Sequence, residues 1–178
     1  MKTTEIGLNL IKHFEGLHDG DLRQIGLQPK ACPAGIYTEG YGRAMRDKKG
    51  NFIRDKKTAL ANISIRNEAE ALKALANDIK VFEDIVMRKV KVALKPNEFD
   101  ALVSHTYNTG GSNNLFSLIN KKASNDDILK RFVNHYITAN GVQMRGLIER
   151  RKAEAKLFFN VKYKAYETKK KIFRHRSW

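Results

Sequence analysis

The residue with the clearest capacity for chemistry is Glu15, which stands where a helical pattern gives way to a glycine-rich segment. At such a junction a carboxylic acid can face a cleft while apolar neighbours, here Phe14 and Leu17, shield it from water. Burial of a carboxyl group favours its protonated form, which is the form that a proton donor needs. A glutamate at a helix end is more often a solvated surface residue, so Glu15 alone does not define a site.

A second segment with this potential is residues 32–42, which read CPAGIYTEGYG. The pattern predicts a hairpin with Pro-Ala-Gly as its turn and a strand, containing Thr38, that ends in a Gly-Tyr-Gly bend. Glycines in that bend would let the backbone and a bound molecule approach each other closely. The same pattern also suits a purely structural turn, and this segment by itself leaves both interpretations open.

The element that would carry Glu15 is a first helix over residues 5–14. Apolar residues recur there at helical spacing, and Thr3 and Thr4 precede them as potential N-caps. From Gly16 to Asn51 glycines are frequent and apolar runs are short. This segment is therefore predicted to form turns and short strands.

From residue 67 onward the pattern returns to helix. Asn67 and Glu70 form a variant of the capping box ahead of a long amphipathic helix that runs through residue 86. Pro96 in a first turn and the stop at Gly110-Gly111 bound another helix, and further helices are expected at about residues 113–121, 125–136 and 144–159. We therefore expect an α+β fold with a small glycine-rich β lobe, about residues 16–55. A larger helical lobe, about residues 60–160 together with the first helix, completes it.

The chain is strongly basic, with 34 Lys and Arg against 19 Asp and Glu and a formal net charge of +15. A field of this strength concentrates a protein on nucleic acid, anionic envelope polymers or anionic lipid, or serves only as a solubilising surface. The single cysteine, Cys32, excludes an internal disulfide and multi-cysteine zinc sites. The five histidines lack metal-ligand spacing, so we expect no metal ion. We expect no organic cofactor either.

The N-terminal segment predicts synthesis in a cytoplasm. Asn9, Lys12 and His13 interrupt its apolar residues, so it lacks the continuous apolar region of a secretory signal peptide. No stretch of the chain approaches transmembrane length.

Three separated motifs together resemble the phage endolysins of glycoside hydrolase family 24, most closely the lambdoid and enterobacterial-phage branch. The first motif is Phe14-Glu15-Gly16-Leu17 followed by residues 32–42. Residues 99–111, FDALVSHTYNTGG, resemble the central helix of the family and its glycine stop. Residues 146–154, GLIERRKAE, resemble its C-terminal arginine-rich helix. The motifs occur in the family's order, and the resemblance covers residues 5–159.

The resemblance implies a lysozyme-like fold with a cleft between the lobes. It also implies hydrolysis of the β-1,4 bond between N-acetylmuramic acid and N-acetylglucosamine in bacterial peptidoglycan, which lyses the host cell. Glu15 matches the catalytic acid, Cys32 the second position, which the family fills with Asp or Cys, and Thr38 the hydroxyl that positions water or substrate. Glu15 would protonate the leaving oxygen while a water held by Thr38 and Cys32 attacks with inversion. Three further residues of these motifs are expected to bind substrate: Tyr41, Tyr107 and Asn108.

The chain departs from the family near the site. Sixteen residues, Gly16 to Ala31, separate Glu15 from Cys32, about twice the family's usual gap. The extra segment adds Asp19 and Asp21, which could supply the carboxylate that Cys32 lacks or simply solvate a loop. Another departure is Glu39, which could keep the proton on Glu15 by like-charge repulsion or pair with Arg43, a residue that stands where the family often has histidine.

The C-terminal extension, residues 161–178, lies beyond the last motif and has seven Lys and Arg against one Glu, with aromatic residues between them. This composition suits contact with anionic envelope polymers or lipid, or a solvated helix whose aromatic side packs on the lobe. It suits base stacking equally well, although the sequence carries no nucleic-acid fold signature.

Three functions therefore compete. An endolysin, made in the host cytoplasm and acting as a monomer on the wall once the membrane is permeabilised, explains the motifs. A basic nucleic-acid-binding protein explains the charge but not the series Glu15, Cys32 and Thr38. A catalytically inactive wall-binding homologue would account for the long gap and for Glu39.

Overall fold

The structure is a computed structural model that describes residues 1–19, 26–32, 34–139 and 141–159. A first helix, α1 (Glu5–Glu15), leads into three short strands, β1 (Lys30–Ala31), β2 (Tyr37–Glu39) and β3 (Arg43–Ala44). Four helices follow, α2 (Lys56–Ala61), α3 (Glu68–Asp78), α4 (Lys80–Lys89) and α5 (Pro96–Thr109). The remainder comprises α6 (Asn113–Asn120), α7 (Asn125–Val133), the strands β4 (Thr138–Ala139) and β5 (Val142–Gln143), and α8 (Arg145–Phe158).

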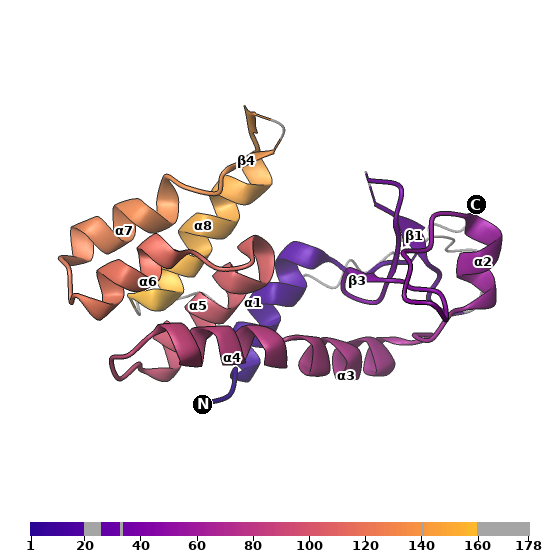
Figure 1. Ribbon diagram of the computed structural model, residues 1–178, viewed down its shortest axis with the longest axis horizontal. Coiled ribbons are helices and arrows are strands. Elements are labelled where there is room, and N and C mark those ends of the chain that lie inside the picture. The colour runs from indigo at the N-terminus through magenta and orange to yellow at the C-terminus, as the bar shows by residue number, and fades with distance from the viewer. Residues whose placement is uncertain (20–25, 33, 140, 160–178) are drawn as a thin grey trace, which may run out of the picture.

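The elements form two lobes, as the sequence predicts (Figure 1). The strands β1, β2 and β3 pair antiparallel in that order, with Thr38 opposite both Lys30 and Ala44. The helices α5 to α8 gather at the opposite end of the molecule, and α3 and α4 run between the two ends. The fold is thus α+β with a larger helical part.

Each lobe has its own buried cluster of apolar side chains. The main cluster is built around α5, whose residues from Phe99 to Thr106 are buried, and it includes Leu10 and Ile11 of α1. A much smaller cluster in the β lobe consists of Met45, Ile53 and Ala59, with Tyr37 packed against it. Because α1 contributes to the main cluster, Glu15 at its end is fixed relative to the helical lobe.

The N-terminus is tied down differently from the prediction. Thr4 does precede α1, but its hydroxyl does not cap the helix. It donates instead to the carboxylate of Asp100 on α5, whose other oxygen accepts the Thr4 backbone N–H at 2.8 Å. Burial raises the pKa of Asp100, while these hydrogen bonds from Thr4 act in the opposite direction. The first helix is thus anchored by a buried carboxyl group of α5, a helix that packs against it.

Two expected helices differ from their predicted extents. The long helix expected from residue 67 ends at Asp78 and resumes at Lys80, with the buried Ile79 between the two parts. The helix expected to reach residue 136 stops at Val133, and Tyr136 adopts a positive φ of 56°. The chain then forms the β4–β5 hairpin, which the sequence did not predict.

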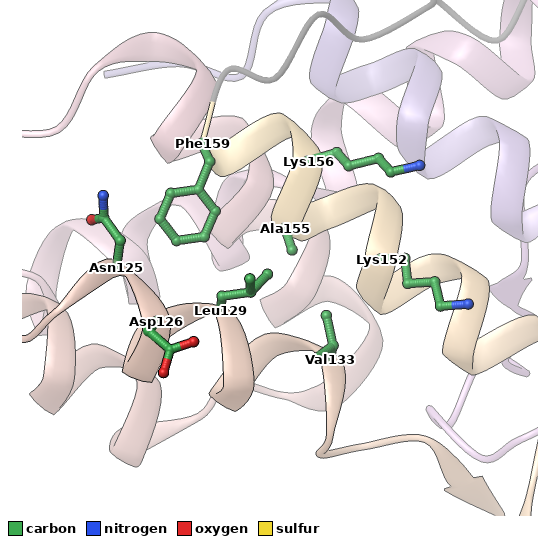
Figure 2. A pocket seen from close by; sticks show the side chains of 8 residues that line it. All are labelled: Asn125, Asp126, Leu129, Val133, Lys152, Ala155, Lys156 and Phe159. Carbon is green, nitrogen blue, oxygen red and sulfur yellow. The ribbon is translucent and has the colours of Figure 1, made fainter.

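An apolar pocket of about 530 Å³ lies between α7 and α8, away from Glu15 (Figure 2). The side chains of Leu129, Val133, Ala155 and Phe159 line it, and the ammonium groups of two lysines at its edge point away from them, Lys152 and Lys156. In the part of the chain that the structure describes, no helix is long and apolar enough to span a membrane.

Candidate active site

The carboxyl group of Glu15 is held between the two lobes by a buried arginine. Glu15 is the last residue of α1, and Gly16 ends the helix with a φ of 69°, in the region that favours glycine. The Glu15 side chain is 22% exposed, and its Oε1 accepts a hydrogen bond from Nη1 of Arg150 at 2.7 Å. The Arg150 side chain is only 4% exposed. One carboxyl oxygen of Glu15 is therefore fixed, and the other is left for chemistry.

Arg150 is itself part of a buried network on α8. Its Nε lies 3.2 Å from Oε1 of Glu154, which also accepts a 2.8 Å hydrogen bond from the hydroxyl of Ser104. Arg151 contacts the same fully buried Glu154 at 3.2 Å. The charge of Arg150 is thus shared between two carboxyl groups, those of Glu15 and Glu154.

A pocket of about 380 Å³ opens beside Glu15 and Arg150. Glu15, Asn108 and Arg150 supply its polar atoms, and Met144 and Leu147, just after the β4–β5 hairpin, supply apolar surface. The pocket has the mixed lining of a site that orients a polar ligand against an apolar wall. Sequence reasoning found Glu15 and Asn108 but missed the contribution of the hairpin region.

On the β side, the Gly-Tyr-Gly bend lies directly against the second oxygen of Glu15. Gly42 has a φ of 84°, and a Cβ placed on it would stand 3.2 Å from Oε2 of Glu15 and 3.8 Å from Nε2 of His18. A side chain at this position would be strained and would crowd the carboxyl group. The glycine therefore permits the close approach that the sequence predicts for this bend.

His18 is a residue of this site that the sequence analysis did not single out. Its backbone N–H donates to the carbonyl of Gly40 at 2.7 Å, forming an isolated bridge to the bend. Burial and the nearby Lys30 lower the pKa of His18, while the Glu15 carboxylate acts in the opposite direction. The available signal was its position three residues after Glu15.

Thr38 and Cys32 lie in the β lobe. The Thr38 hydroxyl donates to the carbonyl of Lys30 at 2.9 Å, and the residue is 7% exposed. Its hydroxyl proton is thus committed, which leaves the oxygen lone pairs to accept a hydrogen bond. Cys32 is a free, half-buried cysteine at the start of the turn, where its N–H donates to the carbonyl of Ile36 at 2.8 Å.

The polar atoms of the expected substrate-binding residues already form hydrogen bonds within the protein. The Tyr41 hydroxyl donates to Glu68 at 3.0 Å, and the Tyr107 hydroxyl donates to the Tyr41 carbonyl at 3.3 Å. Burial, with a smaller contribution from Glu15, raises the pKa of Tyr107, so its hydroxyl keeps its proton. Asn108 lines the pocket, but its Oδ1 accepts a hydrogen bond from Arg151 at 2.8 Å.

The carboxylate of Glu39 is engaged in hydrogen bonds that hold the fold together. Its carboxylate accepts hydrogen bonds from the hydroxyl of Ser64 and from two backbone N–H groups ahead of α3, at 2.9 and 3.0 Å. Arg43 does not form the suggested ion pair with it, and instead lies 3.5 Å from Asp78 on α3. Glu39 thus ties the β lobe to the segment before α3.

The two auxiliary aspartates are placed only in part. Asp19 is half-buried directly after His18, and Asp21 lies outside the described residues. Across the described ranges, no group of three His, Cys, Asp or Glu side chains is arranged to hold a metal ion.

Comparison with known proteins identifies relatives of this chain. The phage lysozyme family model matches residues 12–154. The endolysin of Bacillus phage B103 is 31% identical over 166 residues, covering 89% of this chain and 54% of that protein. The endolysin of Acyrthosiphon pisum secondary endosymbiont phage 1 is 29% identical over 164 residues, covering 89% of this chain and 98% of that protein. The chain thus spans about half the length of the first relative and nearly all of the second.

A solved structure shares the fold over almost the whole chain. The endolysin from Escherichia coli O157:H7 phage FAHEc1 superposes with a TM-score of 0.69 at 27% identity, covering 92% of this chain and 96% of that one. The matched family segment contains Glu15, the Gly-Tyr-Gly bend and Arg150. On this evidence the chain belongs to the phage lysozyme family.

Proposed function

We propose that this protein is an endolysin that hydrolyses the β-1,4 bond between N-acetylmuramic acid and N-acetylglucosamine in bacterial peptidoglycan. The observation that carries the proposal is the placement of Glu15. It lines a pocket of about 380 Å³, with one carboxyl oxygen held by Arg150 at 2.7 Å and the other directed toward the Gly-Tyr-Gly bend. Membership of the phage lysozyme family supports the same activity.

In the proposed mechanism Glu15 is the general acid. It donates a proton to the glycosidic oxygen as the bond to the sugar breaks and positive charge develops at the anomeric carbon. A water molecule, which donates a hydrogen bond to the Thr38 oxygen and is oriented by the group at Cys32, attacks that carbon from the opposite face. Its surplus proton passes to solvent, so that a hydroxyl group remains on the sugar. The expected product is inverted at the anomeric carbon, because no group is assigned to form a covalent intermediate.

The decisive experiment is digestion of purified peptidoglycan followed by analysis of the new reducing ends. The protein should clear the suspension and release fragments that end in N-acetylmuramic acid. Glu15→Gln should lower the rate at least about a hundredfold with unchanged circular dichroism, because the amide cannot donate the proton. Glu149→Gln, at an exposed position on α8, is the matched control and should keep full activity.

Two outcomes would contradict the proposal. A folded Glu15→Gln variant that keeps more than about a tenth of the activity would remove Glu15 from the acid role. Binding to peptidoglycan without any new reducing ends would instead identify a wall-binding homologue without catalysis.

We also infer that the C-terminal extension, residues 161–178, directs the protein to anionic polymers or lipids of the envelope. It has seven Lys and Arg against one Glu, and such a segment is attracted to anionic surfaces by about 1 kcal/mol per cation. It begins two residues after Phe159, which lines the apolar pocket beside Lys152 and Lys156 (Figure 2). The lysozyme domain would then comprise residues 1–160 and act as a monomer, reaching the wall from the host cytoplasm after membrane permeabilisation.

Removal of residues 161–178 tests this inference. Cleavage of short soluble glycan oligomers should stay nearly unchanged, while action on intact envelopes should weaken. The difference should fade toward roughly 1 M salt, where the Debye length is about 3 Å. A parallel loss on both substrates, together with a lower melting temperature, would mean that the extension only stabilises the domain.

A further inference from the structure

His18 is a titratable group of the site to which neither the family motifs nor the proposed mechanism gives a task. It follows α1 by three residues and is held by its backbone N–H on the carbonyl of Gly40, 2.7 Å away. Its Nε2 and the Oε2 of Glu15 both lie within 4 Å of the same point above the Cα of Gly42. The imidazole and the carboxyl oxygen that Arg150 leaves unbound therefore both border Gly42, and they interact electrostatically.

The two carboxyl oxygens of Glu15 have different environments. On the helical side, the buried guanidinium of Arg150 binds Oε1 at 2.7 Å. On the β side, Oε2 lies against Gly42, which has no side chain, and the His18 ring borders the same glycine. A proton on Glu15 must sit on Oε2, because Oε1 already accepts from a cation that has no lone pair to offer in return.

We propose that His18 is a positioning residue for the catalytic acid, and that its neutral imidazole confines Oε2 of Glu15 in the orientation from which the proton is donated. This inference rests on the assignment of Glu15 as the general acid. A neutral ring nitrogen can hold Oε2 through one bridging water molecule, and it does so without adding a charge to the site.

The charge state of His18 then controls the acid. The Glu15 carboxylate raises the pKa of His18, whereas burial and Lys30 lower it, and the net result is a pKa below 6.5. Because coupling between two groups is reciprocal, an imidazolium at this position favours the carboxylate of Glu15, which cannot donate a proton. Among the described residues, Lys30 on β1 and Glu15 on α1 are the charged groups that act on the ring. Activity should therefore fall on the acidic side as His18 gains its proton.

The test uses the full chain with two substitutions that keep His18 from titrating. His18→Gln leaves a polar group near the position of Nε2, and His18→Leu fills similar space without one. Soluble glycan strands serve as substrate between pH 4.5 and pH 8. His135→Gln, at an exposed position in the helical lobe, is the matched control.

His18→Gln should lower kcat at pH 7 by about threefold and shift the acidic limb of the kcat profile to lower pH. His18→Leu should lower kcat at least about tenfold while KM changes less than about twofold, because orientation of the acid matters in the transition state. An unchanged acidic limb in both variants, or a loss confined to KM, would overturn the proposal.

A second measurement does not depend on activity. The NMR titration of His18 should give a lower pKa in Glu15→Gln than in the unmodified protein, because the substitution removes the carboxylate that raises it. An identical titration in both proteins would show that the ring does not face Glu15 and would overturn the inference. If Glu15→Gln retains hydrolysis, the assignment of the acid fails instead, and the two failures are thereby distinguished.

Discussion

Nη1 of Arg150 on α8 lies 2.7 Å from Oε1 of Glu15 on α1, and this contact joins two residues that are 135 positions apart. The same guanidinium reaches Glu154 at 3.2 Å and the carbonyl of Ser104 at 3.3 Å. The orientation of the candidate acid therefore depends on the packing of α8 against α1 and α5.

Replacing Arg150 should damage both stability and activity. Arg150→Met leaves the buried Glu154 with one cationic partner instead of two and frees Oε1 of Glu15. Loss of one partner from a buried ion pair costs about 3–5 kcal/mol, so urea denaturation should detect a loss of that order. Lys152→Gln, which breaks an exposed 3.2 Å ion pair with Glu149 on the same helix, should change stability by less than about 1 kcal/mol. Equal effects of the two substitutions would mean that the buried network contributes no more than a surface pair.

Gly42→Ala should separate crowding of the acid from backbone strain. Both Gly42, with a φ of 84°, and Gly50, with a φ of 86°, hold conformations that disfavour alanine by about 1–2 kcal/mol. A Cβ at Gly42 would lie 3.2 Å from Oε2 of Glu15, whereas a Cβ at Gly50 meets nothing within 4 Å. Both variants should lose similar stability in thermal melts, but only Gly42→Ala should lose hydrolytic activity, by about tenfold or more. Comparable activity in the two variants would indicate that the bend does not set the geometry of the acid.

Substitution of Cys32 tests the second catalytic position. Cys32→Asp should remain active, since an aspartate can hold the attacking water, whereas Cys32→Ala or alkylation of the thiol should lower the rate on purified peptidoglycan. Because Cys32 is the only cysteine of the chain, alkylation is specific to this site. Full activity in Cys32→Ala combined with loss in Asp19→Asn or Asp21→Asn would assign the role to the segment after His18.

Acid should destabilise the protein partly through His105. Burial, reinforced by Arg151, Arg150 and Arg131, lowers the pKa of His105 from its usual 6.5 to about 3. The unfolded chain therefore binds a proton at His105 below about pH 6.5 while the folded chain does not until about pH 3, so stability is lost as the pH falls through this window.

Between pH 7 and pH 4 this linkage amounts to about 3 kcal/mol. From pH 7 to pH 4 the free energy of unfolding should decrease by about 3 kcal/mol less in His105→Gln than in the unmodified protein. This comparison does not depend on how much the substitution destabilises the protein at pH 7. Urea titrations at the two pH values measure the difference, and His135→Gln, at an exposed position, is the control. The same pH dependence in His105→Gln as in the unmodified protein would show that His105 does not stay neutral.

The sequence predicted those features whose causes are local. The helix over residues 5–14 and the stop at Gly110 follow from periodicity and from glycine at a left-handed C-cap, and both are confirmed. The capping role of Asn67 is confirmed as well, because its side chain accepts the N–H of Glu70. The β4–β5 hairpin was missed because each of its strands is two residues long, too short for an alternation pattern to register.

The features that the sequence could not give are contacts between distant segments. Nothing near Glu39 in the chain indicates that its carboxylate accepts hydrogen bonds from Ser64 and Ile65. Pairing with Arg43 was one of two local alternatives for this residue, and that alternative was wrong. Arg150 joined the site for the same reason, since it reaches Glu15 only after α8 packs against α1. His18 joined it through its bond to the Gly40 carbonyl, which also links distant segments. The roles of Cys32, Thr38 and the expected substrate-binding residues stay predictions.

The unequal size of the two buried clusters has a consequence for how the site opens. The three buried side chains of the β-lobe cluster, Met45, Ile53 and Ala59, contribute roughly 1.5–3 kcal/mol for each large one, far less than the cluster around α5. The strands should therefore open in local fluctuations that leave the helices intact. In such a fluctuation Glu15 stays on Arg150, and the Gly-Tyr-Gly bend is held by Tyr41, which belongs to the main cluster, while the strands that carry Thr38 move. Hydrogen exchange at the amides of Tyr37 and Met45, which are bonded within this lobe, would then report how readily the β lobe opens.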